Sequence, residues 1–263
     1  MFVRRRDCFA LPLAGLFVAP FAAQAQVRDL NDAINKAGRQ RMLSQRCAKA
    51  WLAIGQNVRK EQADKVLADS MALFDRQLVE LRAFATASAP RATYSELDGA
   101  WSAYKLALVG SAPNRAGAEA LLAASGKVLS LAHQGTEQLE QLSGKAVGRL
   151  VNLAGRQRML SQRMAAAYLG ASWGVQGDTL TRAVTQAQTE FQAAHAQLKA
   201  AGENTQTIRH ELEAVEQQYA FFEAALRSLK AGQPDARAQG EVFTTSERIL
   251  QLMDGVTSLY AKL

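Results

Sequence analysis

The residues best suited to chemistry lie in a ten-residue segment that occurs twice. Residues 37–46 read AGRQRMLSQR and recur without a change as residues 154–163, 117 positions later. Each copy carries three arginines, whose planar, forked guanidinium donors suit the oxygens of nitrate, carboxylate or phosphate. Ten identical residues in a row indicate an internal duplication. Because the flanking residues are only similar, the identity indicates a constraint beyond packing.

Read as a helix, each copy places one arginine in the middle of an otherwise apolar or small face. At about 100° per residue this arginine is Arg41 in the first copy and Arg158 in the second. A guanidinium in a partly dry groove is costly unless it meets an anion. Gly38 and Gly155 lie one turn earlier and leave room for a small ligand or a close helix. A second apolar line on the opposite side predicts that each helix is buried between its own bundle and another.

The arginines therefore have two interpretations, which the residues alone leave open. In the first, Arg41 and Arg158 contact a small bound anion, and Gln45 and Gln162, on the same stripe, add polar contacts. In the second, each arginine pairs with Asp or Glu of a neighbouring helix, and the helix only docks another bundle. Identity of the whole segment in both copies favours the anion site.

The repeated segment also resembles a known family. It is similar to the P box of nitrate/nitrite sensor kinases (NarX-like) and of the N-terminal domain of type IV pili methyl-accepting chemotaxis transducers (PilJ-type), and its wording is closer to the latter. The residues that carry the resemblance are Ile34, Asn35, Lys36, Ala37, Gly38, Arg41, Met42, Ser44 and Arg46, then Val151, Asn152, Ala154, Gly155, Arg158, Met159, Ser161 and Arg163.

The resemblance implies an all-helical sensor bundle in which the central P-box arginine, here Arg41 and Arg158, contacts nitrate or nitrite at a subunit interface. It also implies that further basic residues supply positive potential around the ligand. Those residues are Lys36, Arg46 and Arg163, and Lys36 is replaced by Leu153 in the second copy.

The elements that must position these arginines are helices almost throughout. Heptad-like apolar stripes predict four helices per repeat and no alternating strand pattern appears. Equivalent apolar residues recur at offsets of 117, then 118, then 121, and the offset grows only at predicted loops. The fold expected is all-α: two tandem four-helix, up-down bundles at 26–143 and 144–263.

The connection between the bundles is open at this stage. No proline occurs from about Ala116 to about Trp173, so the last helix of the first repeat could run on as one long helix into the second. Gly144 and Gly148 are the candidate kink positions. A continuous helix would stack the bundles end to end and favour a homodimer, whereas a break would allow a pseudo-dimer within one chain.

The N-terminus predicts export. Basic residues at 4–6, an apolar run from about Phe9 to Ala22 and an A-x-A site predict a signal peptide, residues 1–25, cut near Ala25. No later segment is long and apolar enough to span a membrane. The chain has a formal charge of +7, but an exported protein meets no nucleic acid, so a preference for anions is the expectation. The location expected is the periplasm.

The remaining side chains indicate no enzyme, metal or cofactor. His133, His195 and His210 lack metal-ligand spacing and are expected at the surface or in caps. No nucleophile motif, P-loop or GxGxxG occurs. The function that the resemblance implies is a sensory module for nitrate or nitrite that relays occupancy to a membrane receptor or sensor kinase. The alternative is a helical interaction protein of a type IV pilus or chemotaxis receptor system.

Overall fold

The computed structural model describes residues 26–263, which form eight helices and no strand. The helices are α1 (Leu30–Gly55), α2 (Lys60–Phe84), α3 (Ser88–Val109), α4 (Arg115–Ser143), α5 (Ala146–Ser172), α6 (Gly177–Lys199), α7 (Gln206–Leu226) and α8 (Ala236–Tyr260). The all-α expectation is confirmed. Residues 1–25, which hold the expected signal peptide, lie outside the described residues.

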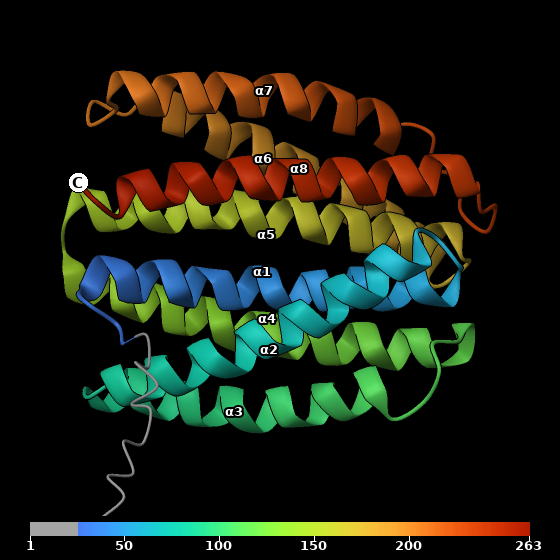
Figure 1. The fold of residues 1–263 in the computed structure, drawn as a ribbon, viewed down its shortest axis with the longest axis horizontal. Helices are drawn as coiled ribbons and strands as arrows, with labels where there is room; N and C mark the ends of the chain where they lie inside the picture. Colours follow the sequence, from blue (N-terminus) through green and yellow to red (C-terminus); the bar gives the residue numbers. More distant parts are fainter. Residues whose placement is uncertain (1–25) are drawn as a thin grey trace, which may run out of the picture.

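The helices form two four-helix groups that lie side by side (Figure 1). In the first group α1 packs against α2 and α4, and α3 packs on α4; in the second, α5 packs against α6 and α8, and α7 packs on α8. The two motif helices, α1 and α5, run in the same direction through the centre and form the largest contact between the groups. The predicted burial of the motif helices on both sides is therefore observed.

The sequence left open whether one long helix runs through both repeats, and the structure shows that it does not. The chain leaves α4 at Gly144, which has φ 59°, and α5 begins two residues later. A left-handed residue ends an α-helix, and glycine adopts that conformation without steric cost. The sharp turn at Gly144 brings α5 back beside α1 instead of extending α4. The end-to-end stacking expected from a continuous helix does not occur.

Close packing of α1 on α5 depends on small residues at their contact. Ala33, Ala37 and Ala154 are fully buried there or beside it. A Cβ added to Gly38 would lie 3.8 Å from the Cα of Gly155, and one added to Gly155 would lie 3.7 Å from the Cα of Gly38. The two backbones thus approach at the glycine of each motif, and the close-helix role predicted for these glycines is observed.

The opposite side of each motif helix packs into its own bundle. Leu43 and Cys47 of α1, and their counterparts Leu160 and Met164 of α5, are all 0 % exposed. Burial also raises the pKa of the Cys47 thiol far above its ordinary value. Cys47 is therefore a core residue, as its replacement by methionine in the second repeat suggests.

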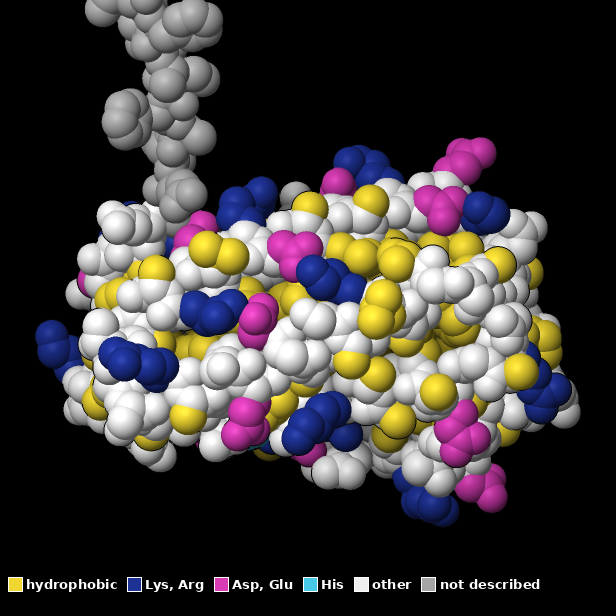
Figure 2. All heavy atoms as spheres, turned by 90° about the horizontal axis from the view of Figure 1, so that it is seen from below, with side chains coloured by type: hydrophobic (Ala, Val, Ile, Leu, Met, Phe, Trp, Pro, Cys, Tyr) yellow, Lys and Arg dark blue, Asp and Glu magenta, His cyan; other side chains and the backbone are white. Residues whose placement is uncertain are grey.

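The outer surface is of mixed character. Seen from the α3 side, acidic and basic side chains are interspersed, and apolar side chains gather towards one half of the face (Figure 2). Leu106 and Val109 of α3 are among the large apolar residues that stay exposed. No helix within residues 26–263 is long and apolar enough to cross a membrane.

The glycine contact can be tested by filling it. Gly38→Leu should lower the free energy of unfolding by about 1–3 kcal/mol, because the new side chain must push α1 from α5. Gly99→Leu is the matched control, since a Cβ at this helical position would meet nothing within 4 Å. The control should instead raise stability by up to about 1 kcal/mol through helix propensity. Urea denaturation measures both, and equal effects would contradict the close-contact role.

Candidate functional site

The two P-box arginines meet at the contact between α1 and α5. Arg41 and Arg158 are 1 % and 0 % exposed. The Nη2 of Arg41 donates to the Oδ1 and the carbonyl O of Asn152 at 2.6 and 3.2 Å. The Nη2 of Arg158 donates to the Oδ1 and the carbonyl O of Asn35 at 2.9 and 3.2 Å. Each arginine thus reaches across to the same asparagine position of the other repeat, which gives the chain an internal pseudo-twofold relation.

Both guanidinium groups also lie over the glycine pair. A Cβ on Gly38 would lie 3.2 Å from the Nη2 of Arg41 and 3.6 Å from that of Arg158. Burial, and then the charge of Arg158, lower the pKa of Arg41 to about 9. Burial lowers the pKa of Arg158 to about 10. Both groups are therefore protonated at neutral pH, and two buried like charges repel each other unless anions offset them.

Arg158 has such an anion within the protein. Its Nη1 lies 2.5 Å from the Oδ1 of Asp254 on α8, and the Nη2 of Arg39 lies 2.7 Å from the same oxygen. Burial opposes ionisation of this carboxyl group, but the charges of Arg158 and Arg39 lower its pKa below the ordinary value. The second of the two sequence interpretations, a protein carboxylate, is therefore met on this side.

Arg41 has no carboxylate within ion-pair distance among the described residues. Its Nη1 lies 3.2 Å from the Nδ1 of His133 on α4, and its buried Nε has no hydrogen-bond partner within residues 26–263. Burial, and then the charge of Arg41, lower the pKa of His133. The ring is thus neutral at neutral pH, with Nδ1 accepting from Arg41 and Nε2 donating to Glu137 at 3.1 Å.

A cavity of about 240 Å³ lies beside Arg41 and is lined by residues of α1, α4, α5 and α6. Besides Arg41 and His133, it is lined by Arg156 and Arg163 of the second motif. Arg156 pairs with Glu190 at 2.8 Å, whereas Arg163 forms no ion pair or hydrogen bond with any described residue. Three arginines and one carboxylate make this cavity a cationic environment.

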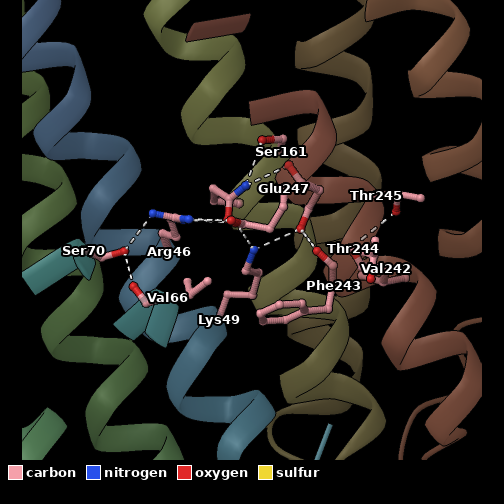
Figure 3. Close-up of polar contacts among 12 residues, drawn as sticks. Arg46, Lys49, Val66, Ser70, Ser161, Val242, Phe243, Thr244, Thr245 and Glu247 are labelled. Atoms are coloured by element: carbon pink, nitrogen blue, oxygen red, sulfur yellow. Dashed lines mark hydrogen bonds and ion pairs between the residues drawn. The ribbon is translucent and has the colours of Figure 1, made fainter. Parts of the chain in front are cut away.

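Arg46, the counterpart of Arg163 in the first motif, has different partners. Arg46 forms a forked contact with Glu247 of α8, from Nε at 3.0 Å and from Nη2 at 2.5 Å. Lys49, which is 0 % exposed, donates to the same carboxylate at 2.6 Å and lies 4.4 Å over the Phe243 ring. Figure 3 shows both cations of α1 pointing at Glu247 from one side, with Arg46 also reaching Ser70.

The fold thus brings together only part of the predicted set. Arg41, Arg158, Gly38 and Gly155 form the centre of the α1–α5 contact, and Arg163 lines the cavity beside it. Arg46 lies in the separate pair with Glu247.

Lys36, Gln45 and Gln162 point elsewhere. Lys36 pairs with Glu80 at 2.6 Å and Asp32 at 3.2 Å. The Nε2 of Gln45 donates to Ser125, and that of Gln162 to the carbonyl of Ser246, each within its own bundle. These three side chains therefore structure their bundles and do not face Arg41.

Sequence reasoning missed the residues that surround the arginines. His133, Asp254 and Glu247 lie on the last helix of each bundle, far from the motif along the chain. One signal was present: the offset of 121 that relates α4 to α8 pairs His133 with Asp254. A histidine opposite an aspartate in an otherwise repeated helix marks a chemical difference between the two copies.

The arrangement is that of an all-helical protein built from two copies of one four-helix unit. The chain matches, twice, the family model described as type IV pili methyl-accepting chemotaxis transducer N-terminal domain, over residues 23–135 and 138–242. The chain belongs to this family, in two tandem copies. No curated protein and no solved structure shows significant similarity to it.

The Glu247 cluster makes a pH prediction. The charges of Lys49 and Arg46 outweigh burial and lower the pKa of Glu247 from 4.5 to about 2. A carboxyl whose pKa is lower in the folded state adds stability above its unfolded pKa, and that stability is lost as the pH falls towards the folded value. Folding stability should therefore fall by up to about 3 kcal/mol through this group between about pH 4.5 and 2.

Glu247→Gln should remove this acid dependence. At pH 7 the substitution should lower the free energy of unfolding by about 3 kcal/mol, because Lys49 is left buried without its carboxylate. The difference in free energy of unfolding between variant and parent should shrink as the pH falls. Glu241→Gln is the control and should change little, because Glu241 lies on the same helix but is exposed and pairs, among the described residues, only with Arg237. Denaturant titrations at a series of pH values measure the slopes; parallel slopes for parent and Glu247→Gln would refute the assignment.

Proposed function

We propose that the chain is an exported, periplasmic sensory module that binds a small anion, nitrate or nitrite first, in the cavity beside Arg41. The observation that carries this proposal is a guanidinium that is 1 % exposed, has no carboxylate partner among the described residues and lines a cavity. A buried charge of this kind is costly until an anion reaches it. Arg41 is the principal contact, and Arg156 and Arg163 add positive potential.

The site lies where the two repeats meet, so the chain acts as its own pseudo-dimer. Arg41 belongs to the first repeat, whereas Arg156, Arg163 and the acceptor Asn152 belong to the second. The family resemblance supports a ligand site between two copies of a bundle, and here one chain supplies both copies. A homodimer is not required to complete the site.

Anion binding at this place can act on the contact between the bundles. The bound charge offsets the repulsion between Arg41 and Arg158, which face each other across α1 and α5. Relief of that repulsion favours closer packing of the two motif helices, and a membrane receptor or sensor kinase that grips both bundles can read the change. No catalytic step, cofactor or nucleic-acid partner forms part of the proposal.

A second candidate is a helical interaction protein of a pilus or chemotaxis receptor system. It is favoured by the carboxylate that already holds Arg158 and by the exposed apolar residues Leu106 and Val109. Under this candidate no small anion stabilises the folded chain, so one experiment separates the two functions.

Anions should raise the melting temperature of mature protein if the proposal holds. A ligand that binds only the folded state adds RT ln(1 + [L]/Kd), about 2.7 kcal/mol at a hundredfold excess over Kd. Nitrate, nitrite, sulfate and small carboxylates are compared at equal ionic strength with chloride. Arg41→Ala together with Arg158→Ala should abolish the shift and keep the helical circular dichroism spectrum. A double variant that responds like the parent would show that the site is elsewhere.

A further inference from the structure

The groove on the other side of the pseudo-twofold is built from the same positions as the Arg41 cavity. It has a volume of about 600 Å³ and lies between α1, α2 and α8. At the offset of 117, Arg39, Met42 and Arg46 of this groove correspond to Arg156, Met159 and Arg163 of the cavity. At the offset of 121, residues 247, 250, 251 and 254 of the groove correspond to residues 126, 129, 130 and 133 of the cavity. The groove and the cavity are therefore lined largely by repeat-equivalent positions, although Arg158, the counterpart of Arg41, does not itself line the groove.

The α8 groove and the α4 cavity differ in whether protein side chains supply negative charge. In the α8 groove Asp254 and Glu247 project carboxylates at the arginines. In the α4 cavity the same positions hold His133 and Gly126, which supply no negative charge. Arg41 and Arg163 consequently lack the carboxylates that their counterparts, Arg158 and Arg46, possess.

We propose that Asp254 and Glu247 are built-in anions that fill the second copy of the site, so that the chain takes up one external anion only, at Arg41. This inference rests on the proposed function and says which half of the duplicated site performs it. The Arg158 half is held permanently in the occupied state, and the Arg41 half is the one that senses.

The contacts of Asp254 show where the external anion belongs. A single oxygen, Oδ1, bridges the Nη1 of Arg158 at 2.5 Å and the Nη2 of Arg39 at 2.7 Å. The equivalent guanidinium groups in the cavity are Arg41 and Arg156, so an anion between them reproduces this bridge. Because a planar carboxylate fills the second copy, the ligand class that fits the open copy is a planar monoanion, such as nitrate, nitrite or a small carboxylate.

The acidic residue that lines the open cavity does not take this role. Glu190 comes from α6 and pairs with Arg156 at 2.8 Å. Its counterpart in the groove is Leu73, not one of the α8 carboxylates. Glu190 therefore holds Arg156 in place from outside the duplicated set, and Arg41 and Arg163 are left without a carboxylate among the described residues. Figure 3 shows the contrasting state of the groove, in which Glu247 already takes both Arg46 and Lys49.

Titration calorimetry of the mature chain tests the stoichiometry. Nitrate is one probe, and acetate is the second because it imitates the side-chain carboxylate of Asp254. One anion per chain is expected for a probe that binds. Two per chain would overturn the inference and leave the proposed function standing, whereas no binding of either probe would overturn both.

A carboxylate placed in the cavity beside Arg41 should compete with the external anion and weaken its binding. His133→Asp puts the residue of the second copy beside Arg41, and affinity for the probe should fall at least tenfold. His133→Asn is the matched control, uncharged and of similar size to aspartate, and should stay within about threefold of the parent. A His133→Asp variant that binds like the parent, with unchanged circular dichroism, would overturn the inference.

Removing the carboxylate of Asp254 should let an external anion bind at Arg158. Asp254→Ala is expected to bind two acetate ions per chain, and acetate should raise its melting temperature more than it raises that of the parent. Glu241→Gln removes an exposed carboxylate from the same helix and should keep one site. If Asp254→Ala is too unstable for calorimetry, the melting shift with acetate decides: a shift no larger than the parent's would overturn the inference.

Discussion

The structure depends on a close crossing of two helices that each carry a buried arginine. Glycines at the crossing let α1 and α5 approach until the backbone of one nearly touches the other. The same approach places Arg41 and Arg158 against the glycine pair, away from water. Packing favours the contact and electrostatics opposes it, because two cations share a region of low dielectric. The polar residues around the crossing accept hydrogen bonds from the two arginines and so reduce the cost of burying their charges.

The partners of the buried arginine differ between the two halves of the chain. On one side Arg158 binds Asp254 in addition to its asparagine. Glu247 on the same helix pairs with Arg46 and Lys49 of α1. On the other side the same asparagine contact is completed by a neutral histidine, and a cavity lies alongside. The two repeats carry the same arginine and the same asparagine, and their fourth helices carry different partners for the arginine.

The position on α4 and α8 of the residues that meet Arg41 and Arg158 has a physical basis. The motif helices are buried on two faces, so nearly every side chain there has a packing role, and the arginines contact each other's repeat. On the fourth helices, the two positions that meet the arginines are partly exposed, so water partly screens a change of charge there. Asp254, for example, keeps a side chain that is 41 % exposed although it binds a fully buried arginine. A change in the partner of the arginine therefore disturbs the packing less on these helices than on α1 or α5.

The sequence by itself determined the helical class, the duplication, the central arginines and the glycines that accompany them. These follow from local periodicity and from residue identity between the repeats, which need no knowledge of distant contacts. It could not determine the helix break at Gly144, because a glycine without a proline is compatible with both a kink and a turn. It also could not assign the partners of Lys36, Gln45 and Arg46, which share a helix with Arg41 but point into other contacts. The tertiary structure alone decided that α1 and α5 lie side by side, that Asp254 and not a ligand meets Arg158, and that His133 meets Arg41. Those contacts join residues about 90 or more positions apart, and no pattern within one helix specifies which neighbour a packed arginine will meet.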